Sequence, residues 1–295
     1  MLRLVTWNIN RQPEAWRTLL AGGVDIALLQ EAVPPPADVA NRVELDLAPP
    51  WRTAGKGSHR PWRAAIARVS EAVSITPRRC APPDETGPDD LMVSRPGTLA
   101  VADVTVAATG ETITVASVYG AWENPISSVP SEWIYADASV HRLISDLSAL
   151  VGTQRGHKLI VAGDLNILRG YGEHGSAYWA RRYATVFDRM DAIGVPCVGP
   201  ELPSGGEPPL IRPDELPSES RTVPTFRTHQ TDPSAATRQL DFVFASRALH
   251  DRVTVRALNS QDEWGPSDHC RVAIDVAPPL DTSETVAAPQ DRNAN

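Results

Sequence analysis

Short apolar runs and amphipathic stretches alternate along most of the chain. Residues 2–8 alternate between apolar and polar side chains, which is the two-residue period of a half-buried β-strand. The next stretch, 12–21, has the apolar spacing of a helix, and the run 25–30 is short and apolar like a buried strand. The same criteria predict further strands at 64–69, 99–106, 112–119, 158–162, 240–245, 252–257 and 271–276.

Capping residues set the limits of two longer helices. Ser131 is a suitable N-cap for a helix that continues to about Val151, and Gly152 is a suitable stop. A second helix is predicted over 178–193, ended by Gly194. Because helices and strands are interleaved, the chain is predicted to be an α/β protein.

Turns and irregular segments indicate a single domain. Thr109-Gly110 predicts a hairpin between two neighbouring strands. The stretches 77–96 and 200–224 are rich in Pro, Gly, Asp and Glu, and strands continue after each, so both are predicted to be surface loops. We expect one domain over residues 1–277 and a disordered tail over 278–295, which is small and polar.

Composition limits the classes of function. With 42% hydrophobic and 22% charged residues, the 295-residue chain can bury an ordinary core. A net charge of −8 argues against broad polyanion binding but leaves room for a local basic groove. The three cysteines are too few and too scattered for a disulfide framework or a zinc cluster: Cys80, Cys197 and Cys270. No secretory leader and no membrane-spanning apolar run is visible, so a cytoplasmic, reduced protein is expected.

Carboxylates and amides follow several of the predicted strands. Glu31 comes directly after an apolar run, and Asn8 ends the first strand; each could also be an ordinary strand-end residue or turn cap. Asp164 leaves a wholly apolar strand through Gly163, with Asn166 two positions on. If the chain stays extended there, both side chains share one face and could hold a water; an Asx turn is the alternative.

One histidine of seven stands in a catalytic context. His269 follows Asp268 just before the last strand, and adjacent side chains point in different directions. The imidazole therefore needs a separate orienting acid, which Asp241 can supply at the start of another strand. Asp268 then remains available to contact a metal or water.

These motifs, in this order, resemble the endonuclease/exonuclease/phosphatase superfamily. The resemblance extends from residue 2 to about residue 276 and rests on Trp7-Asn8, Gln30-Glu31, Tyr119, Gly163-Asp164-Leu165-Asn166, Thr225-Phe226, Leu240-Asp241-Phe242-Val243-Phe244 and Ser267-Asp268-His269. It implies a four-layer α/β sandwich, in which two mixed β-sheets are flanked by helices and the site lies at the edge of the sheets.

The resemblance also implies roles for these residues. Glu31 would be the principal ligand of Mg²⁺, or of Mn²⁺, with Asn8 beside it and Asp268 completing the metal side. Asp164 would activate the water that Asn166 positions. His269, oriented by Asp241, would stabilise charge on the scissile phosphate. Tyr119 resembles the tyrosine of the abasic-site-endonuclease-like branch, where secreted DNases and sphingomyelinases commonly have a histidine; it could also be an ordinary strand tyrosine.

The substrate is indicated less directly. One basic and aromatic segment lies between Glu31 and the next strand and comprises Trp51, Arg52, Lys56, His59, Arg60, Trp62, Arg63 and Arg68. A second follows Asp164 and comprises Arg169, Tyr171, His174, Tyr178, Trp179, Arg181, Arg182 and Tyr183, although its aromatics could instead pack inward. Arginines bind phosphates and aromatic rings stack on bases. The predicted substrate contacts are Arg60, Arg63, Trp122, Arg169, Tyr171 and His174.

Three classes of function remain. The leading hypothesis is a monomeric, magnesium-dependent nuclease that acts on DNA. The alternative is a phosphatase or phosphodiesterase for a small phosphorylated metabolite or lipid head group, which the acidic charge favours. The chain also lacks a basic N-terminal extension, and the segment after Asn166 departs from that of abasic-site repair enzymes. A non-catalytic binding module is disfavoured, because every expected catalytic position is occupied.

Overall fold

The fold is described from a computed structural model, which describes residues 1–46, 50–53, 60–122, 135–152, 156–228 and 231–279. The proposed N-cap Ser131, the basic residues Lys56 and His59, and residues 280–295 of the tail lie outside this part of the chain.

The first of two large sheets joins the two ends of the chain. Its strands are β1 (Leu2–Asn8), β2 (Ile26–Ala32), β3 (Glu44–Leu45), β4 (Arg63–Arg68), β13 (Val253–Leu258) and β14 (Arg271–Val276). They lie in the order β13-β14-β1-β2-β4-β3. β1 is parallel to β2 and antiparallel to β14, so the sheet is mixed. The ends of β1 and β2 and the residues before β14 therefore meet at one edge.

The second large sheet comes from the middle of the chain. Its strands are β5 (Val73–Arg78), β8 (Leu99–Val106), β9 (Thr112–Tyr119), β10 (Leu159–Asp164), β11 (Cys197–Gly199) and β12 (Asp241–Ala245). They lie in the order β11-β12-β10-β9-β8-β5, and a separate pair is formed by β6 (Cys80–Ala81) and β7 (Leu91–Met92). Asp164 is in register with Tyr119 on one side and Asp241 on the other, which brings three polar side chains to one edge.

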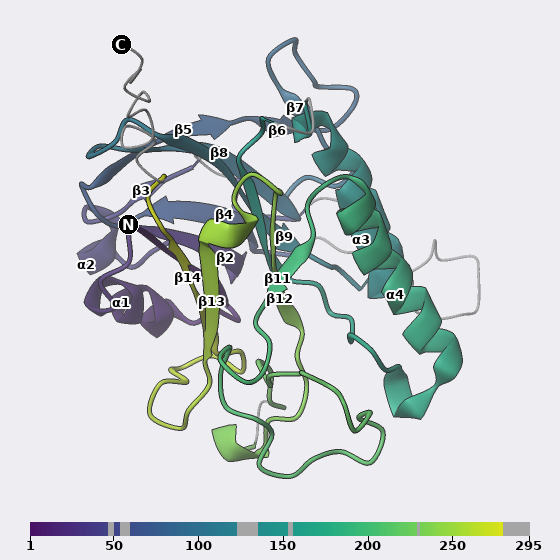
Figure 1. The fold of residues 1–295 in the computed structure, drawn as a ribbon. Coiled ribbons are helices and arrows are strands. Elements are labelled where there is room, and N and C mark those ends of the chain that lie inside the picture. Colours follow the sequence, from purple (N-terminus) through teal and green to yellow (C-terminus); the bar gives the residue numbers. More distant parts are fainter. Residues whose placement is uncertain (47–49, 54–59, 123–134, 153–155, 229–230, 280–295) are drawn as a thin grey trace, which may run out of the picture.

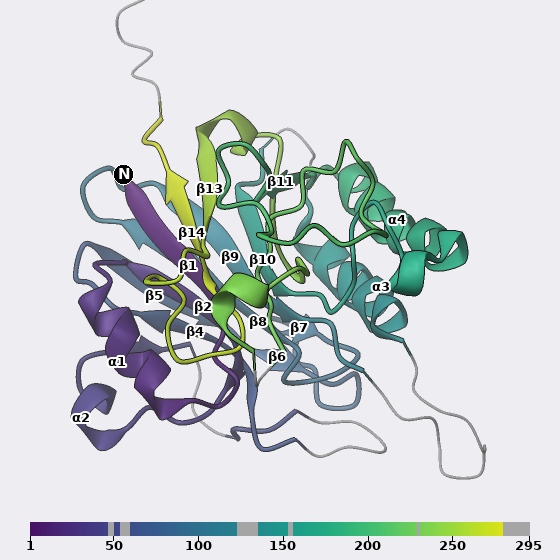
Figure 2. The same cartoon turned by 90° about the horizontal axis from the view of Figure 1, so that it is seen from below.

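Helices cover the outer face of each sheet (Figures 1 and 2). The α-helices are α1 (Pro13–Ala21), α2 (Ala37–Ala40), α3 (Ala136–Leu147) and α4 (Ala177–Ala192). Short 3-10 turns occur at Ser148–Leu150, Glu173–Gly175, Pro233–Ala235 and His250–Arg252. One apolar cluster lies between the sheets, a second joins the first sheet to α1 and α2, and a third joins the second sheet to α3 and α4. The predicted four-layer sandwich is confirmed.

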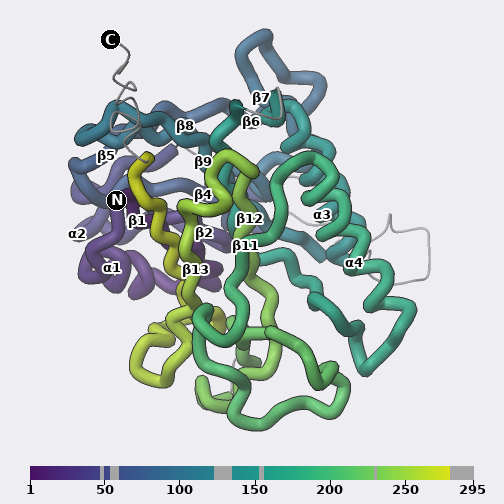
Figure 3. Tube along the Cα trace, viewed as in Figure 1, coloured from purple at the N-terminus to yellow at the C-terminus, as the bar shows by residue number. Residues whose placement is uncertain are grey.

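Most predicted elements are present, with two corrections. The helix α3 ends at Leu147 and tightens into a 3-10 turn, in which Val151 donates its N–H to Ser148, so Gly152 is not its stop. The predicted surface loop 77–96 contains the end of β5 and the strands β6 and β7. The stretch 200–224 contains neither helix nor strand, as expected. The tube in Figure 3 shows this loop at the bottom of the view, beside the segment that joins β13 to β14.

Candidate active site

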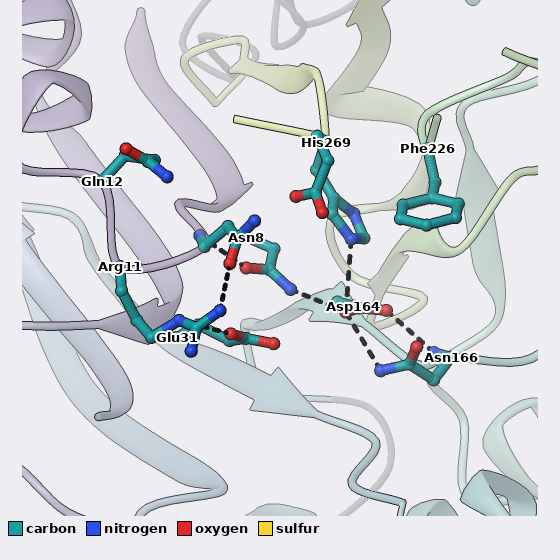
Figure 4. Close-up of a pocket in the computed structure, with 10 residues that line it drawn as sticks. Asn8, Arg11, Gln12, Glu31, Asp164, Asn166, Phe226 and His269 are labelled. Carbon is teal, nitrogen blue, oxygen red and sulfur yellow. Dashed lines mark hydrogen bonds and ion pairs between the residues drawn. The ribbon is translucent and has the colours of Figure 1, made fainter. Parts of the chain in front are cut away.

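A cavity of about 640 Å³ opens where strand ends of the two sheets meet. Its lining comes from both ends and the middle of the chain and comprises Asn8, Asn10, Arg11, Gln12, Glu31, Asp164, Asn166, Phe226, Asp268 and His269 (Figure 4). Parallel strands end at the same edge of a sheet, and ligand sites in α/β folds form at such carboxyl ends. The structure thus brings together most residues that the sequence assigned to catalysis.

Asp164 is the centre of the site. Its carboxylate accepts hydrogen bonds from the side-chain amide of Asn8 (2.9 Å) and from the backbone and side-chain amides of Asn166 (2.9 and 3.1 Å). The chain is not extended after Asp164, because Asn166 has a φ of +52° and closes an Asx turn. The turn still holds the two side chains together. Burial raises the pKa of Asp164, and the neighbouring His269 opposes that rise.

The imidazole of His269 lies between two carboxylates. Its Nδ1 is 2.8 Å from Oδ2 of Asp241, and its Nε2 is 3.7 Å from Oδ2 of Asp164. All three side chains are buried. Burial opposes a charge on His269, but the carboxylates of Asp241 and Asp164 outweigh it and raise the imidazole pKa to about 10. Asp241 is therefore placed to fix the ring and favour its charged form.

Glu31 stands at the opposite wall of the cavity. Its Oε1 accepts a hydrogen bond from the hydroxyl of Tyr119 at 3.2 Å, and its Oε2 is 3.5 Å from Nε of Arg11. Burial, and then the charges of Glu31 and Asp164, raise the pKa of Tyr119, so this tyrosine remains a hydrogen-bond donor. Glu31 has a φ of +47°, an uncommon conformation for a residue other than glycine.

Two groups of side chains could hold a divalent cation. Glu31, Asn8 and Asp268 all line the cavity and offer oxygen atoms, the ligands that Mg²⁺ prefers. In the described part of the chain, the ligand atoms of Asp164, Asp241 and His269 also lie within 4.8 Å of one another. In that second group, Nδ1 of His269 is already engaged by Asp241.

Two predicted substrate contacts lie next to the site. Arg60 donates to the hydroxyl of Tyr119 at 3.4 Å and to the backbone carbonyl of Trp122 at 2.5 Å. Its guanidinium also lies 5.2 Å from the ring of Trp62. Arg60 and Trp122 are thus connected through Tyr119 to Glu31, although Glu31 alone of the four lines the cavity itself.

The other four predicted substrate contacts have different surroundings. Arg63 is buried, pairs with Asp46 at 2.9 Å, and so belongs to the core of the fold. Tyr171 is buried in the apolar cluster under α4. These two assignments are corrected, because neither side chain reaches the cavity.

Arg169 and His174 also do not line the active-site cavity. Arg169 pairs with Glu201 and lines a separate hollow of about 340 Å³ near the loop 200–224. His174 is exposed in a 3-10 turn that precedes α4. As substrate contacts outside the cavity, both assignments stay predictions.

The cavity also contains residues that sequence reasoning did not assign to the site. Asn10 and Arg11 have positive φ values of 42° and 60°, and this turn is anchored because the N–H of Arg11 donates to the carbonyl of Glu31. Phe226 places its ring 4.9 Å from the imidazole of His269. Phe226 could have been assigned to the site, because Thr225-Phe226 is one of the motifs that carry the resemblance. Nothing in the sequence placed Arg11 beside Glu31.

The comparisons with known proteins agree with this geometry. The model of the Endonuclease/Exonuclease/phosphatase family matches residues 5–269, so the chain belongs to that family. A search of the curated proteins found no match.

Similar solved structures include three nucleases. An AP endonuclease from Leishmania major has 17% identity and a TM-score of 0.58, with 94% of this chain and 88% of that chain covered. The endonuclease domain of TRAS1, a telomere-specific non-LTR retrotransposon, has 17% identity and a TM-score of 0.55, with 94% and 98% covered. The 3′-5′ exonuclease NExo from Neisseria meningitidis has 18% identity and a TM-score of 0.52, with 94% and 100% covered. At such identities the likeness shows the fold.

No helix in the described residues is both long enough and apolar enough to cross a membrane.

Proposed function

We propose that the protein is a divalent-metal-dependent hydrolase that cleaves phosphodiester bonds of DNA with an activated water. One observation carries the proposal: a buried carboxylate, Asp164, is held by two amides next to a buried His269–Asp241 pair, in a cavity that Glu31 and Asp268 also line. Phosphoester hydrolysis needs a base for the water and positive charge at the phosphate oxygens. This arrangement offers both.

In this proposal Asp164 takes the proton of the attacking water. The amides of Asn8 and Asn166 fix its carboxylate, and burial raises its pKa toward the range in which a general base works near neutral pH. His269 presents Nε2–H to the phosphate, because Asp241 holds Nδ1 on the other side of the ring. Tyr119 keeps the carboxylate of Glu31 in place through its hydroxyl.

Glu31, Asn8 and Asp268 would hold the metal, which is Mg²⁺ or Mn²⁺. The oxygen donors of these three side chains, all of which line the cavity, fit a hard cation. When bound, the cation neutralises charge on the phosphate oxygens.

DNA is the proposed substrate because the cavity is open and the family includes nucleases. The three similar structures are, by their names, an AP endonuclease, a retrotransposon endonuclease and a 3′-5′ exonuclease. A phosphatase or phosphodiesterase for a small phosphoester is the second candidate. It is favoured by the net charge of −8, and by the pairing of Arg63 and Arg169 with acids of the fold.

A turnover panel with and without Mg²⁺ tests the proposal. The substrates are plasmid, single-stranded DNA, abasic duplex, RNA, inositol phosphates and bis-p-nitrophenyl phosphate. Asp164→Asn and His269→Ala should each lower turnover at least about 100-fold while the fold is retained, since each removes a proton-transfer or charge-stabilising group. Asp251→Asn, at a side chain that is 99% exposed, is the control.

The outcome of the panel separates the two candidate functions. Metal-dependent cleavage of a DNA substrate supports the nuclease, and turnover restricted to inositol phosphates or the small ester supports the second candidate. Near wild-type turnover by both active-site variants would show that the site assignment is wrong.

A further inference from the structure

Four aromatic side chains form a continuous series of ring contacts outside the cavity. This aromatic track consists of Trp122, Tyr135, Trp179 and Tyr178. Successive ring centroids are 5.8, 4.1 and 5.0 Å apart. Trp122 follows β9, Tyr135 precedes α3, and the other two are in the first turn of α4, so the track crosses from the sheet to the helical layer. Figures 1 and 2 show α3 and α4 side by side in that layer.

Arg60 connects the aromatic track to the active site. It donates one hydrogen bond to the carbonyl of Trp122 and another to the hydroxyl of Tyr119. That hydroxyl in turn donates to the proposed metal ligand Glu31. The track is therefore connected to Glu31, which lines the cavity, through the hydrogen bonds of Arg60 and Tyr119.

Packing of the core explains only part of this aromatic content. Tyr183, one turn further along α4, is buried, as expected for the inner face of an amphipathic helix. Tyr178 instead leaves 54% of its surface exposed, and Tyr135 leaves 39% exposed. Each of these two exposed rings contacts the partly buried ring of Trp179, which packs on the core, and exposed aromatic rings are typical of binding surfaces.

Positive charge accompanies the exposed rings. The guanidinium of Arg182 lies 5.9 Å from the ring of Tyr178 and 5.3 Å from that of Trp179. Arg182 also pairs with Asp137, so part of its charge is neutralised. Arg181 is exposed and lies one helical turn from Tyr178. Rings beside guanidinium groups match a ligand with flat bases and a phosphate backbone.

We propose that the aromatic track binds unpaired bases of a single-stranded DNA end, which then leads into the active site. Aromatic rings stack on the face of any base, whereas in a duplex each base face is covered by its neighbours. The track therefore selects single-stranded or frayed ends over fully paired DNA. This inference rests on the proposed function and names the form of its substrate.

Binding without turnover tests the track directly. The affinity for a short fluorescein-labelled single strand is measured by fluorescence anisotropy in EDTA, beside a blunt duplex of the same length and an oligosaccharide. Tyr178→Ala should weaken single-strand binding about tenfold through loss of one stacked base, and Tyr178→Phe should retain it. Met92→Ala is the matched control, since Met92 is an apolar side chain with similar exposure, 55%, on β7.

The outcomes distinguish failure of the track from failure of the proposed function. Wild-type affinity in Tyr178→Ala, equal losses for single strand and duplex, or binding of the oligosaccharide alone would each overturn the track. These measurements need no metal and no cleavage. If the wild-type protein cleaves no nucleic acid in the turnover panel, the proposed nuclease function fails, whatever the binding result.

Discussion

At the scale of single residues, Glu31 is the side chain on which the metal hypothesis depends most. Its side chain is 17% exposed and is held from two directions, by Tyr119 and by Arg11. Its positive φ is maintained because its carbonyl accepts the N–H of Arg11. Backbone in a sparsely populated conformation is frequent at functional sites, so this strain supports a role beyond the fold.

Replacement of Glu31 should therefore remove metal binding with little change in the fold. Glu31→Gln keeps the shape and the acceptor for Tyr119 but loses the charge that a hard cation requires. We expect the affinity for Mn²⁺, measured by calorimetry, to fall at least about tenfold. Glu71→Gln, at an exposed position after β4, should match the wild type. If both variants bind equally well, the cation is held elsewhere, and the group of Asp164, Asp241 and His269 becomes the candidate.

The sequence located the carboxylates of the candidate site well. It did not show which arginines and tyrosines point toward that site. Asp164 and Glu31 lie at the ends of apolar strands, and the strand end fixes their location. The direction of Arg63 depends instead on Asp46, an acid 17 positions earlier in the chain. Tyr171 likewise turns inward because apolar side chains of distant elements surround it. Such pairings are tertiary, so no local pattern reveals them.

At the scale of elements, β9 and β10 leave no room for a side chain at residue 163, next to the proposed base Asp164. A Cβ added to Gly163 would collide with the backbone carbonyl of Val118 on β9. The strands can therefore keep their register only if residue 163 has no side chain. Because Asp164 follows directly, this contact also positions the proposed base.

Gly163→Ala should accordingly be strongly destabilising. The strands must separate to admit a methyl group, and overpacking of this kind costs about 1–3 kcal/mol. Urea denaturation should show a lower free energy of unfolding by at least about 2 kcal/mol, together with lower turnover. Gly152→Ala is the matched control, because nothing lies within 4 Å of its added Cβ. Equal stability of the two variants would contradict the close approach.

Two partly buried ion pairs of one glutamate join the β8–β9 hairpin to two other elements. Glu111 contacts Lys158, just before β10, at 2.5 Å and binds Arg252, just before β13, through two bonds of 2.6 and 2.8 Å. The hydrogen bond from Arg252 is the largest cause that lowers the pKa of Glu111 from 4.5 to about 2; burial opposes it, and Lys158 contributes further lowering. The charged form of Glu111 is thus stabilised by folding.

The stabilisation by Glu111 should depend on pH in one direction. Because its pKa is lower in the folded protein, the stabilisation is complete above about pH 4.5 and disappears as the pH falls toward 2. Glu111→Gln should lower the free energy of unfolding by about 2 kcal/mol at pH 7, with a difference that stays constant down to about pH 4.5 and shrinks below it. Urea titrations between neutral and acidic pH measure this, with Glu71→Gln as the reference. If the free energies of unfolding of the wild type and Glu111→Gln differed by the same amount at every pH, the charge of Glu111 would not be the source of the stabilisation.

Several strands could be predicted from the sequence, whereas β5 could not. Strands such as β1, β8 and β9 have clear apolar patterns, and their predicted bounds agree with the structure. β5 was missed because Pro77 interrupts it and a proline cannot donate to a ladder. The strand tolerates the proline because β5 lies at the edge of its sheet. Sheet order depends on long-range pairing and is not present in local periodicity.

At the scale of the whole molecule, the proposed site exists only because two separate sheets are held in a fixed relative position. Asn8 and Glu31 come from the first sheet, and Tyr119 and Asp164 come from the second. A small polar network in the core between the sheets connects them: the side-chain amide of Gln30 donates to the hydroxyls of Thr6 (3.1 Å) and Ser117 (3.0 Å).

The hydroxyl of Ser117 completes this connection by donating to the carbonyl of Leu29 at 2.8 Å. Both partners are buried strand groups of the opposite sheet. A buried polar group without a partner costs about 1–3 kcal/mol, so the network favours one alignment of the sheets over others. Gln30 immediately precedes Glu31, which couples that alignment to the site.

Removal of the Ser117 hydroxyl should therefore affect stability and catalysis together. Ser117→Ala leaves the amide of Gln30 and the carbonyl of Leu29 short of one partner each, and should cost about 1–3 kcal/mol of unfolding free energy. Turnover should also fall, because Tyr119, two residues further along β9, holds Glu31 across the same sheet boundary. Thr105→Ala removes only an exposed hydroxyl bond and should leave both quantities nearly unchanged. Loss of stability without loss of turnover in Ser117→Ala would show that the sheets keep their alignment without this network.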